Sequence, residues 1–134
     1  LSKALVGRLP KHVIYEGVNG IPNRPDYLRK LLQGHIGLNF AHTSGGTNVK
    51  KYDYALAGLV ILSNALGAKG EILPHEYIFT DVNDLAAKLG ELLGMDPKNL
   101  EKMGENNATR ATESAMKARL ILEKRLKELV ASQV

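Results

Sequence analysis

Short apolar runs alternate with amphipathic stretches along most of the chain. Four of the runs have the length of strands: residues 13–16, 36–40, 60–63 and 77–79. Runs of this kind are typical of strands buried in a parallel sheet. Before the first of them, residues 1–9 are expected to form a short helix. Strands that alternate with helices predict a layered α/β fold with a parallel sheet of about four strands flanked by helices.

Two predicted helices lie between these strands. The first covers residues 26–33, with Asp26 as its cap and with Leu28, Leu31 and Leu32 expected to face inward. The second covers residues 49–57 and is expected to end at Gly58. Each would connect two strands that follow one another along the chain, whatever their order in the sheet.

The last third of the chain is predicted to be helical. Thr80 is expected to cap a helix that ends at Gly94 and carries the apolar positions Leu85, Ala86, Leu89, Leu92 and Leu93. Asp96 and Pro97 then begin a long helical segment, about residues 97–131. Gly104, Asn106 and Asn107 leave open whether this segment is broken or is one bent helix. Its later part carries the apolar positions Ala115, Ala118, Leu122, Leu126 and Leu129.

The connection between the second and third predicted strands carries the strongest candidate chemistry. Residues 43–48 are almost all turn and cap residues, and a helix follows them. The free N–H groups and the dipole of a helix N-terminus attract an anion, and Gly45 and Gly46 let it approach the backbone. Lys50 lies in the first helical turn and Asp53 on the same face, so the two are suited to a diphosphate and a ribose. Two glycines after a strand are equally typical of a tight turn, and Lys50 with Asp53 of an ordinary helix-face pair.

Residues 45–63 follow, in order, a pattern of the GT-B glycosyltransferases, family four in particular: a glycine loop, a Lys, an acidic residue and a small-residue segment before a strand. Residues 65–70, 77–86 and 100–108, and the strand at 13–16 with Gly17, also resemble the donor-binding, C-terminal domain of that family. The chain departs from the family at Gly45, usually acidic, at Asp53, often Glu, and at Val60, usually Pro. The family's first βαβ unit, with its phosphate-binding Gly-Arg segment, has no counterpart in residues 1–134.

The resemblance implies a single, partial Rossmann-like nucleotide-sugar-binding domain over residues 1–134, excised from a longer glycosyltransferase. It implies a nucleoside diphosphate sugar as donor, held by Ser44, Gly45, Gly46, Thr47, Asn48, Lys50 and Asp53, with Gly17 near the base and His42 beside the phosphate or sugar. Sugar transfer would proceed with retention and without a metal or other cofactor in this domain. The acceptor site would belong to a missing N-terminal domain, so the chain alone is expected to turn nothing over.

The composition of the chain limits which kinds of site, ligand and cellular location are expected. The chain has 134 residues, which suits one domain, and no Cys, which excludes a disulfide framework and a thiolate nucleophile. Its net charge of +4 suits an anionic ligand but is too diffuse to predict nucleic-acid binding. No apolar run approaches the roughly 20 residues that span a bilayer, so a cytoplasmic place, or one at the membrane's cytoplasmic face through the full-length enzyme, is expected.

Two alternatives to a transferase remain open. One is a nucleotide-binding module without transfer chemistry. The other is an interaction protein that forms a homodimer through a sheet edge or through the long C-terminal helix.

Overall fold

The structure is a computed structural model that describes Lys11, residues 23–42 and residues 49–133. Its elements are α2 (Arg24–Leu31), β1 (Ile36–Asn39), α3 (Val49–Leu56), β2 (Val60–Asn64), β3 (Glu76–Phe79), α4 (Val82–Leu93) and α5 (Pro97–Ala131). The expected helix at residues 1–9 and the expected strand at residues 13–16 lie outside the described residues. The described part is a mixed α/β arrangement, compatible with a Rossmann-like fold.

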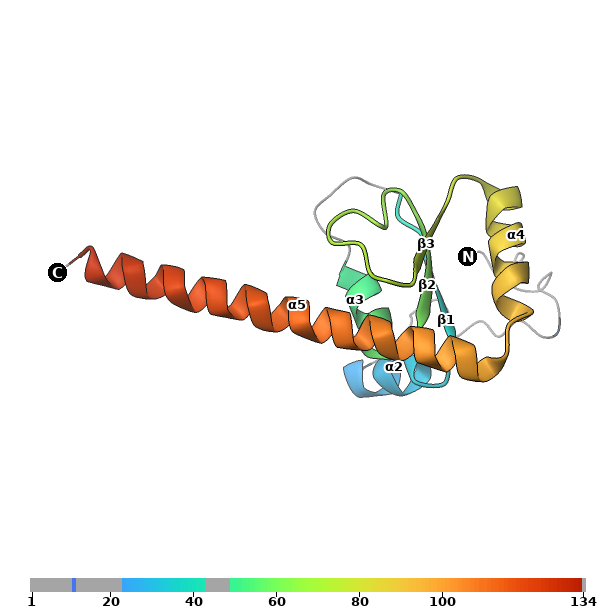
Figure 1. Ribbon diagram of the computed structural model, residues 1–134, viewed down its shortest axis with the longest axis horizontal. Helices are drawn as coiled ribbons and strands as arrows, with labels where there is room; N and C mark the ends of the chain where they lie inside the picture. Colours follow the sequence, from blue (N-terminus) through green and yellow to red (C-terminus); the bar gives the residue numbers. More distant parts are fainter. Residues whose placement is uncertain (1–10, 12–22, 43–48, 134) are drawn as a thin grey trace.

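The described strands form one parallel sheet in the order β1-β2-β3. Ile36 pairs with Val60, and Ile61 pairs with Glu76. The parallel sheet predicted from the apolar runs is therefore confirmed for three strands. Its connections place α3 on one face and α4 on the other (Figure 1).

Alternating residues of β2 supply the two halves of the core. Val60 and Leu62 face α4 and pack with Phe79, Leu92 and Leu100. Ile61 faces α3 and packs with Ala55, Leu73 and Ala111. Because α5 contributes Leu100 to one cluster and Ala111 to the other, this helix crosses from one side of the sheet to the other.

One side chain and one glycine hold α5 against the amino end of the sheet. Asn107 is fully buried, donates to the carbonyls of Leu59 (3.0 Å) and His75 (3.2 Å), and accepts from the His75 N–H (2.9 Å). Gly104 lies against Gly58, where a Cβ would come within 1.8 Å of the Gly58 carbonyl oxygen. From the sequence, Gly104 and Asn107 left open a break in the helix. In the structure α5 is continuous, and these two residues make the contacts that hold it against the sheet.

Several helix boundaries differ from the prediction. Asn23, not Asp26, caps α2, because Pro25 fits the first turn and lets the helix begin ahead of it. Asp81, not Thr80, caps α4, and Thr80 donates its N–H to Asp84 instead. The ends at Gly58, with a φ of 76°, and at Gly94 are confirmed, as is the cap at Asp96.

Two leucine-rich faces are less covered than predicted. Leu28 and Leu32 of the first predicted helix are exposed, the second by 68%, so the expectation that they face inward was wrong. Leu93, at the end of α4, is also exposed. In each case helical spacing gave the face of the helix but not whether another element covers it.

Candidate functional site

The carboxyl ends of all three strands meet at one edge of the sheet, because the strands are parallel. Residues 40–42 leave β1 there, Asn64 ends β2, and Phe79 ends β3 next to the N-terminus of α4. The connection from β1 to α3 begins at this edge, and so does the first turn of α3. Ligands of open α/β sheets bind at such an edge.

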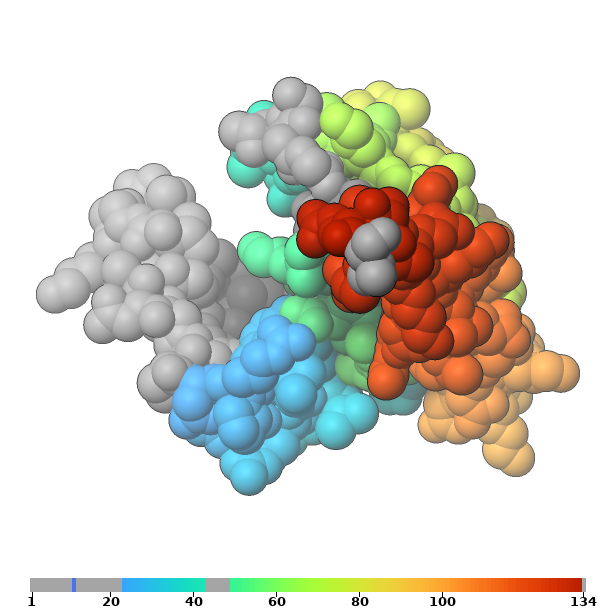
Figure 2. Space-filling model, turned by 90° about the vertical axis from the view of Figure 1, so that its left-hand side faces the viewer, coloured from blue at the N-terminus to red at the C-terminus, as the bar shows by residue number. Residues whose placement is uncertain are grey.

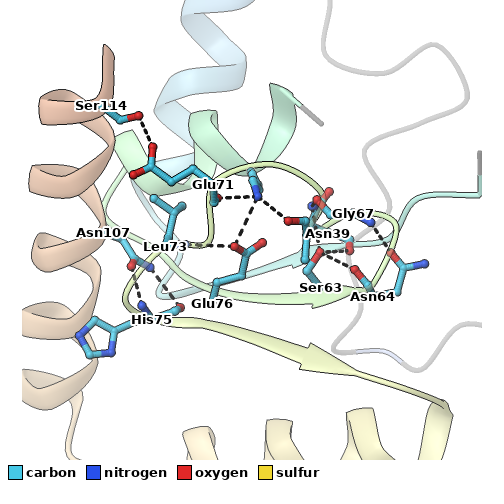
Figure 3. A network of polar contacts seen from close by, with 12 residues as sticks. Asn39, Ser63, Asn64, Gly67, Glu71, Leu73, His75, Glu76, Asn107 and Ser114 are labelled. Carbon is cyan, nitrogen blue, oxygen red and sulfur yellow. Dashed lines mark hydrogen bonds and ion pairs between the residues drawn. The ribbon is translucent and has the colours of Figure 1, made fainter. Parts of the chain in front are cut away.

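Asn64 fixes the exit of β1 to the end of β2. Its side-chain oxygen accepts from the N–H groups of Ala41 (3.1 Å) and Gly67 (2.9 Å), and its amide donates to the Ala41 carbonyl (2.8 Å). One step deeper, buried Asn39 donates to the Ser63 hydroxyl (3.1 Å) and to the Gly67 carbonyl (3.0 Å) (Figure 3). These bonds position the chain where it enters residues 43–48.

Aromatic rings line the edge beside this exit. Phe40 stacks on Phe79 with 6.2 Å between ring centroids, and the His42 ring meets Phe40 edge-on at 4.6 Å. Phe40 and His42 are both exposed. His42 is therefore open to solvent at the mouth of the β1–α3 connection, where the sequence placed it.

Asp53 of α3 is held by a residue that the sequence analysis did not single out. Arg24, at the start of α2, donates from Nη2 to Asp53 Oδ1 (2.6 Å) and from Nη1 to Oδ2 (3.2 Å). The Asp53 side chain is 12% exposed and that of Arg24 is 64% exposed. The bond to Asp53 and the carboxylate charge raise the pKa of Arg24 above its ordinary value.

The two neighbouring lysines of α3 have different surroundings. Lys50 is exposed in the first turn of the helix, whereas Lys51 is fully buried. Lys51 Nζ donates to the carbonyls of Ala68 and Glu71, both at 2.9 Å, and lies 3.5 Å from Glu76 Oε2. Lys51 therefore ties α3 to β3 and to residues 65–75, the connection that follows β2.

The partner carboxylate, Glu76, is also buried. Its Oε2 accepts from the Leu73 N–H at 3.2 Å, while its Oε1 has no hydrogen-bond partner in the part of the chain that the structure describes (Figure 3). Burial raises the pKa of Glu76, and the Leu73 N–H and the Lys51 charge oppose that rise. The only sequence signal for this pair is that Lys51 lies one helical turn before Ala55, on the face that α3 buries.

The structure places two of the predicted site residues, His42 and Lys50, at this edge, holds Asp53 further from it, and leaves the others undescribed. His42 and Lys50 flank the β1–α3 connection, and Asp53 lies one turn further along α3. Ser44, Gly45, Gly46, Thr47, Asn48 and Gly17 lie outside the described residues. Within residues 23–42 and 49–133, no three His, Cys, Asp or Glu side chains gather into a group that could hold a metal ion.

The sequence matches no protein-family model, no curated protein and no solved structure. In the described part of the chain, no helix is both long enough and apolar enough to cross a bilayer. The structure alone therefore defines the protein as a layered α/β protein with a small parallel sheet, and any assignment of function depends on the chemistry at the sheet edge.

Proposed function

We propose that this chain is the donor-binding domain of a glycosyltransferase that moves a sugar from a nucleoside diphosphate to an acceptor. The observation that carries the proposal is the parallel β1–α3–β2 unit. It leads the glycine loop from the carboxyl end of a strand into the N-terminus of a helix that bears Lys50 and Asp53. This is the order of elements in the GT-B domain that residues 45–63 resemble.

The donor diphosphate would lie over the loop, held by the backbone N–H groups of Gly45 and Gly46, the polar side chains of Ser44, Thr47 and Asn48, and the Lys50 ammonium. These groups would stabilise the negative charge that grows on the diphosphate as the glycosidic bond breaks. His42 would contact a phosphate or the sugar from the opposite rim. The base would lie near Gly17.

Asp53 would accept hydrogen bonds from the ribose hydroxyls while it remains paired with Arg24. A carboxylate offers about four acceptor positions, of which Arg24 uses two, one on each oxygen. Since the Arg24 side chain is largely exposed, its other N–H groups are free to approach the diphosphate. Arg24 would also hold the Asp53 carboxylate in place for the ribose.

Calorimetric titration with UDP, GDP and ADP tests the proposal. Lys50→Gln and Asp53→Asn should each weaken binding of the preferred nucleotide about tenfold, as expected for loss of a charged hydrogen bond. Arg24→Gln should weaken it too. Lys98→Gln removes the same charge as Lys50→Gln but at the start of α5, so it is the matched control and should leave the affinity unchanged. Equal loss in Lys50→Gln and Lys98→Gln would contradict a site at this edge.

A nucleotide-binding module without transfer chemistry would give the same titration. The two are separated by joining the chain to an acceptor domain and measuring sugar transfer. Transfer that depends on Lys50 and Asp53 supports the transferase, whereas tight binding with no transfer supports the module.

A further inference from the structure

The C-terminal part of α5 extends beyond the rest of the protein. Figure 1 shows the helix running past the sheet and continuing away from it to the C-terminus. Among the described residues, the last hydrogen bond that joins α5 to the body runs from Ser114 to the Glu71 carboxylate, near the ion pair of Arg110 with Glu71 (2.8 Å). Viewed from its free end, the helix stands in front of the body (Figure 2).

The face that α5 buries on the body continues beyond it. Leu100, Gly104, Asn107 and Ala111 are the buried residues of α5. The next positions on the same side, three or four residues apart, form what we call the stripe: Ala115, Ala118, Leu122, Leu126 and Leu129. All five are exposed, and the three leucines are exposed by 52–61%. An apolar seam of this kind on a projecting helix needs a partner, because an isolated helix is only marginally stable in water.

We propose that the stripe pairs two copies of this chain into an antiparallel helical dimer centred near Leu122. The proposal does not rest on the assignment of a donor site. Its partner is a second copy because the stripe is complementary to itself when it is reversed. Ala115 and Leu129 lie seven residues on either side of Leu122, and Ala118 and Leu126 lie four residues on either side. Reversal therefore sets small side chains opposite large ones, as close helix packing requires.

The charges beside the stripe fit the same arrangement. Arg119 and Glu123 lie on one flank, where Arg119 Nε is 2.8 Å from Glu123 Oε1 in the same helix. In an antiparallel pair equal flanks face each other, so Arg119 of each copy lies near Glu123 of the other. Because both signs occur on this flank, Arg119 of each copy meets Glu123 of the other, which offsets the approach of the two Glu123 side chains to each other.

The position of the body excludes the parallel alternative. Since the body packs on the same face of α5 as the stripe, a parallel pair would force both bodies into the space between the two helices. An antiparallel pair places the bodies at opposite ends, each beyond the stripe of its own helix. Only in the antiparallel direction can the helix of a second copy cover the stripe along its length.

Sedimentation over a wide range of concentrations tests whether the stripe is used. The 14.6 kDa chain should reach twice its mass as the concentration rises. Leu122→Gln should abolish the dimer. Leu120→Gln is the matched control, because it makes the same change in a similarly exposed leucine: Leu120 is 65% exposed and Leu122 is 59% exposed. Leu120 lies about 200° away around the helix, so its replacement should leave the dimer intact. A monomer at every concentration overturns the proposal, and so does equal disruption by the two variants. A chain that stays a monomer because the stripe binds a membrane or another protein counts among the results that overturn it.

Disulfide trapping tests the direction, and the absence of native cysteines makes it clean. In an antiparallel dimer Leu122→Cys should link to itself, because it lies at the centre where the two chains meet. Leu129→Cys alone should not link, but a mixture of Leu129→Cys with Ala115→Cys should. Self-linking of Leu129→Cys would show a parallel pair and refute the proposed arrangement.

Discussion

Two glycines inside helices should respond in opposite ways to replacement by alanine. Alanine is about 1 kcal/mol more favourable than glycine in a helix interior. Gly90 is exposed in α4, and an added Cβ there would have nothing within 4 Å. Gly90→Ala should therefore raise the free energy of unfolding by about 0.5–1 kcal/mol.

At Gly104 the same change meets the backbone of Gly58. The new Cβ would lie 1.8 Å from the Gly58 carbonyl oxygen and 2.5 Å from its carbonyl carbon, whereas real Cβ atoms essentially never come closer than 3.0 Å. Backbone atoms cannot rotate away, so α5 must move and the bonds of Asn107, one turn later, must lengthen. Overpacking costs about 1–3 kcal/mol and each weakened bond about 1 kcal/mol. After the helix gain is subtracted, Gly104→Ala should lose about 2 kcal/mol.

Urea unfolding followed by far-UV circular dichroism and by tyrosine fluorescence measures both variants. Tyr52 and Tyr54 pack against the cluster that includes Ala111, so their fluorescence reports on the contact of α5 with the body. The two variants should differ by about 3 kcal/mol, with similar slopes against urea. A Gly104→Ala protein as stable as Gly90→Ala would refute the close contact of α5 with Gly58.

Two further predictions concern bonds that hold helices. Asn107→Ala leaves the His75 N–H without its partner and removes the bonds that Asn107 donates to the carbonyls of Leu59 and His75, so it should cost about 3 kcal/mol. Asn106→Ala, next to it and exposed, should change stability by less than about 0.5 kcal/mol in the same urea assay. Equal losses would contradict the buried role of Asn107. The hydrogen bond from Lys88, at 2.5 Å, is the largest cause that lowers the pKa of Asp84 in the folded protein. The charged carboxylate therefore stabilises the fold at any pH above the unfolded pKa of about 4. This contribution is lost as the pH falls through the lower pKa of the folded state. Asp84→Asn should therefore be less stable than the wild type at neutral pH, with the difference shrinking in acid, and a difference that grows in acid would contradict this sign.

Local patterns predicted much of the fold. The apolar runs located β1, β2 and β3 within a residue or so, and Gly58, Gly94 and Asp96 marked helix ends, because these signals depend only on residues close in sequence. The caps of α2 and α4 were wrong, since Asn23 and Asp81 each had a competing cap residue within three positions. A choice between such neighbours depends on how the chain approaches the helix, which local pattern does not fix.

The contacts that shape the candidate site are long-range and could not be predicted in the same way. Arg24 reaches Asp53 across 29 positions, and Lys51 reaches Glu76 across 25. Lys50 and Lys51 look alike in the sequence, but the phase of α3 buries one and exposes the other. His42 and Lys50 lie at the predicted edge and Asp53 lies one helical turn further from it, while the roles of all the predicted site residues stay predictions.

An NMR titration of the isotope-labelled chain with UDP, GDP and ADP would locate a donor site on the protein. One nucleotide should shift the amide signals of residues 42–53 and the side-chain signal of Arg24, and these shifts should be lost in Lys50→Gln and Asp53→Asn. Signals of α4 and of the projecting part of α5 should stay in place. Shifts confined to those helices, or no shift with any nucleotide at millimolar concentration, would contradict a donor site at the carboxyl edge of the sheet.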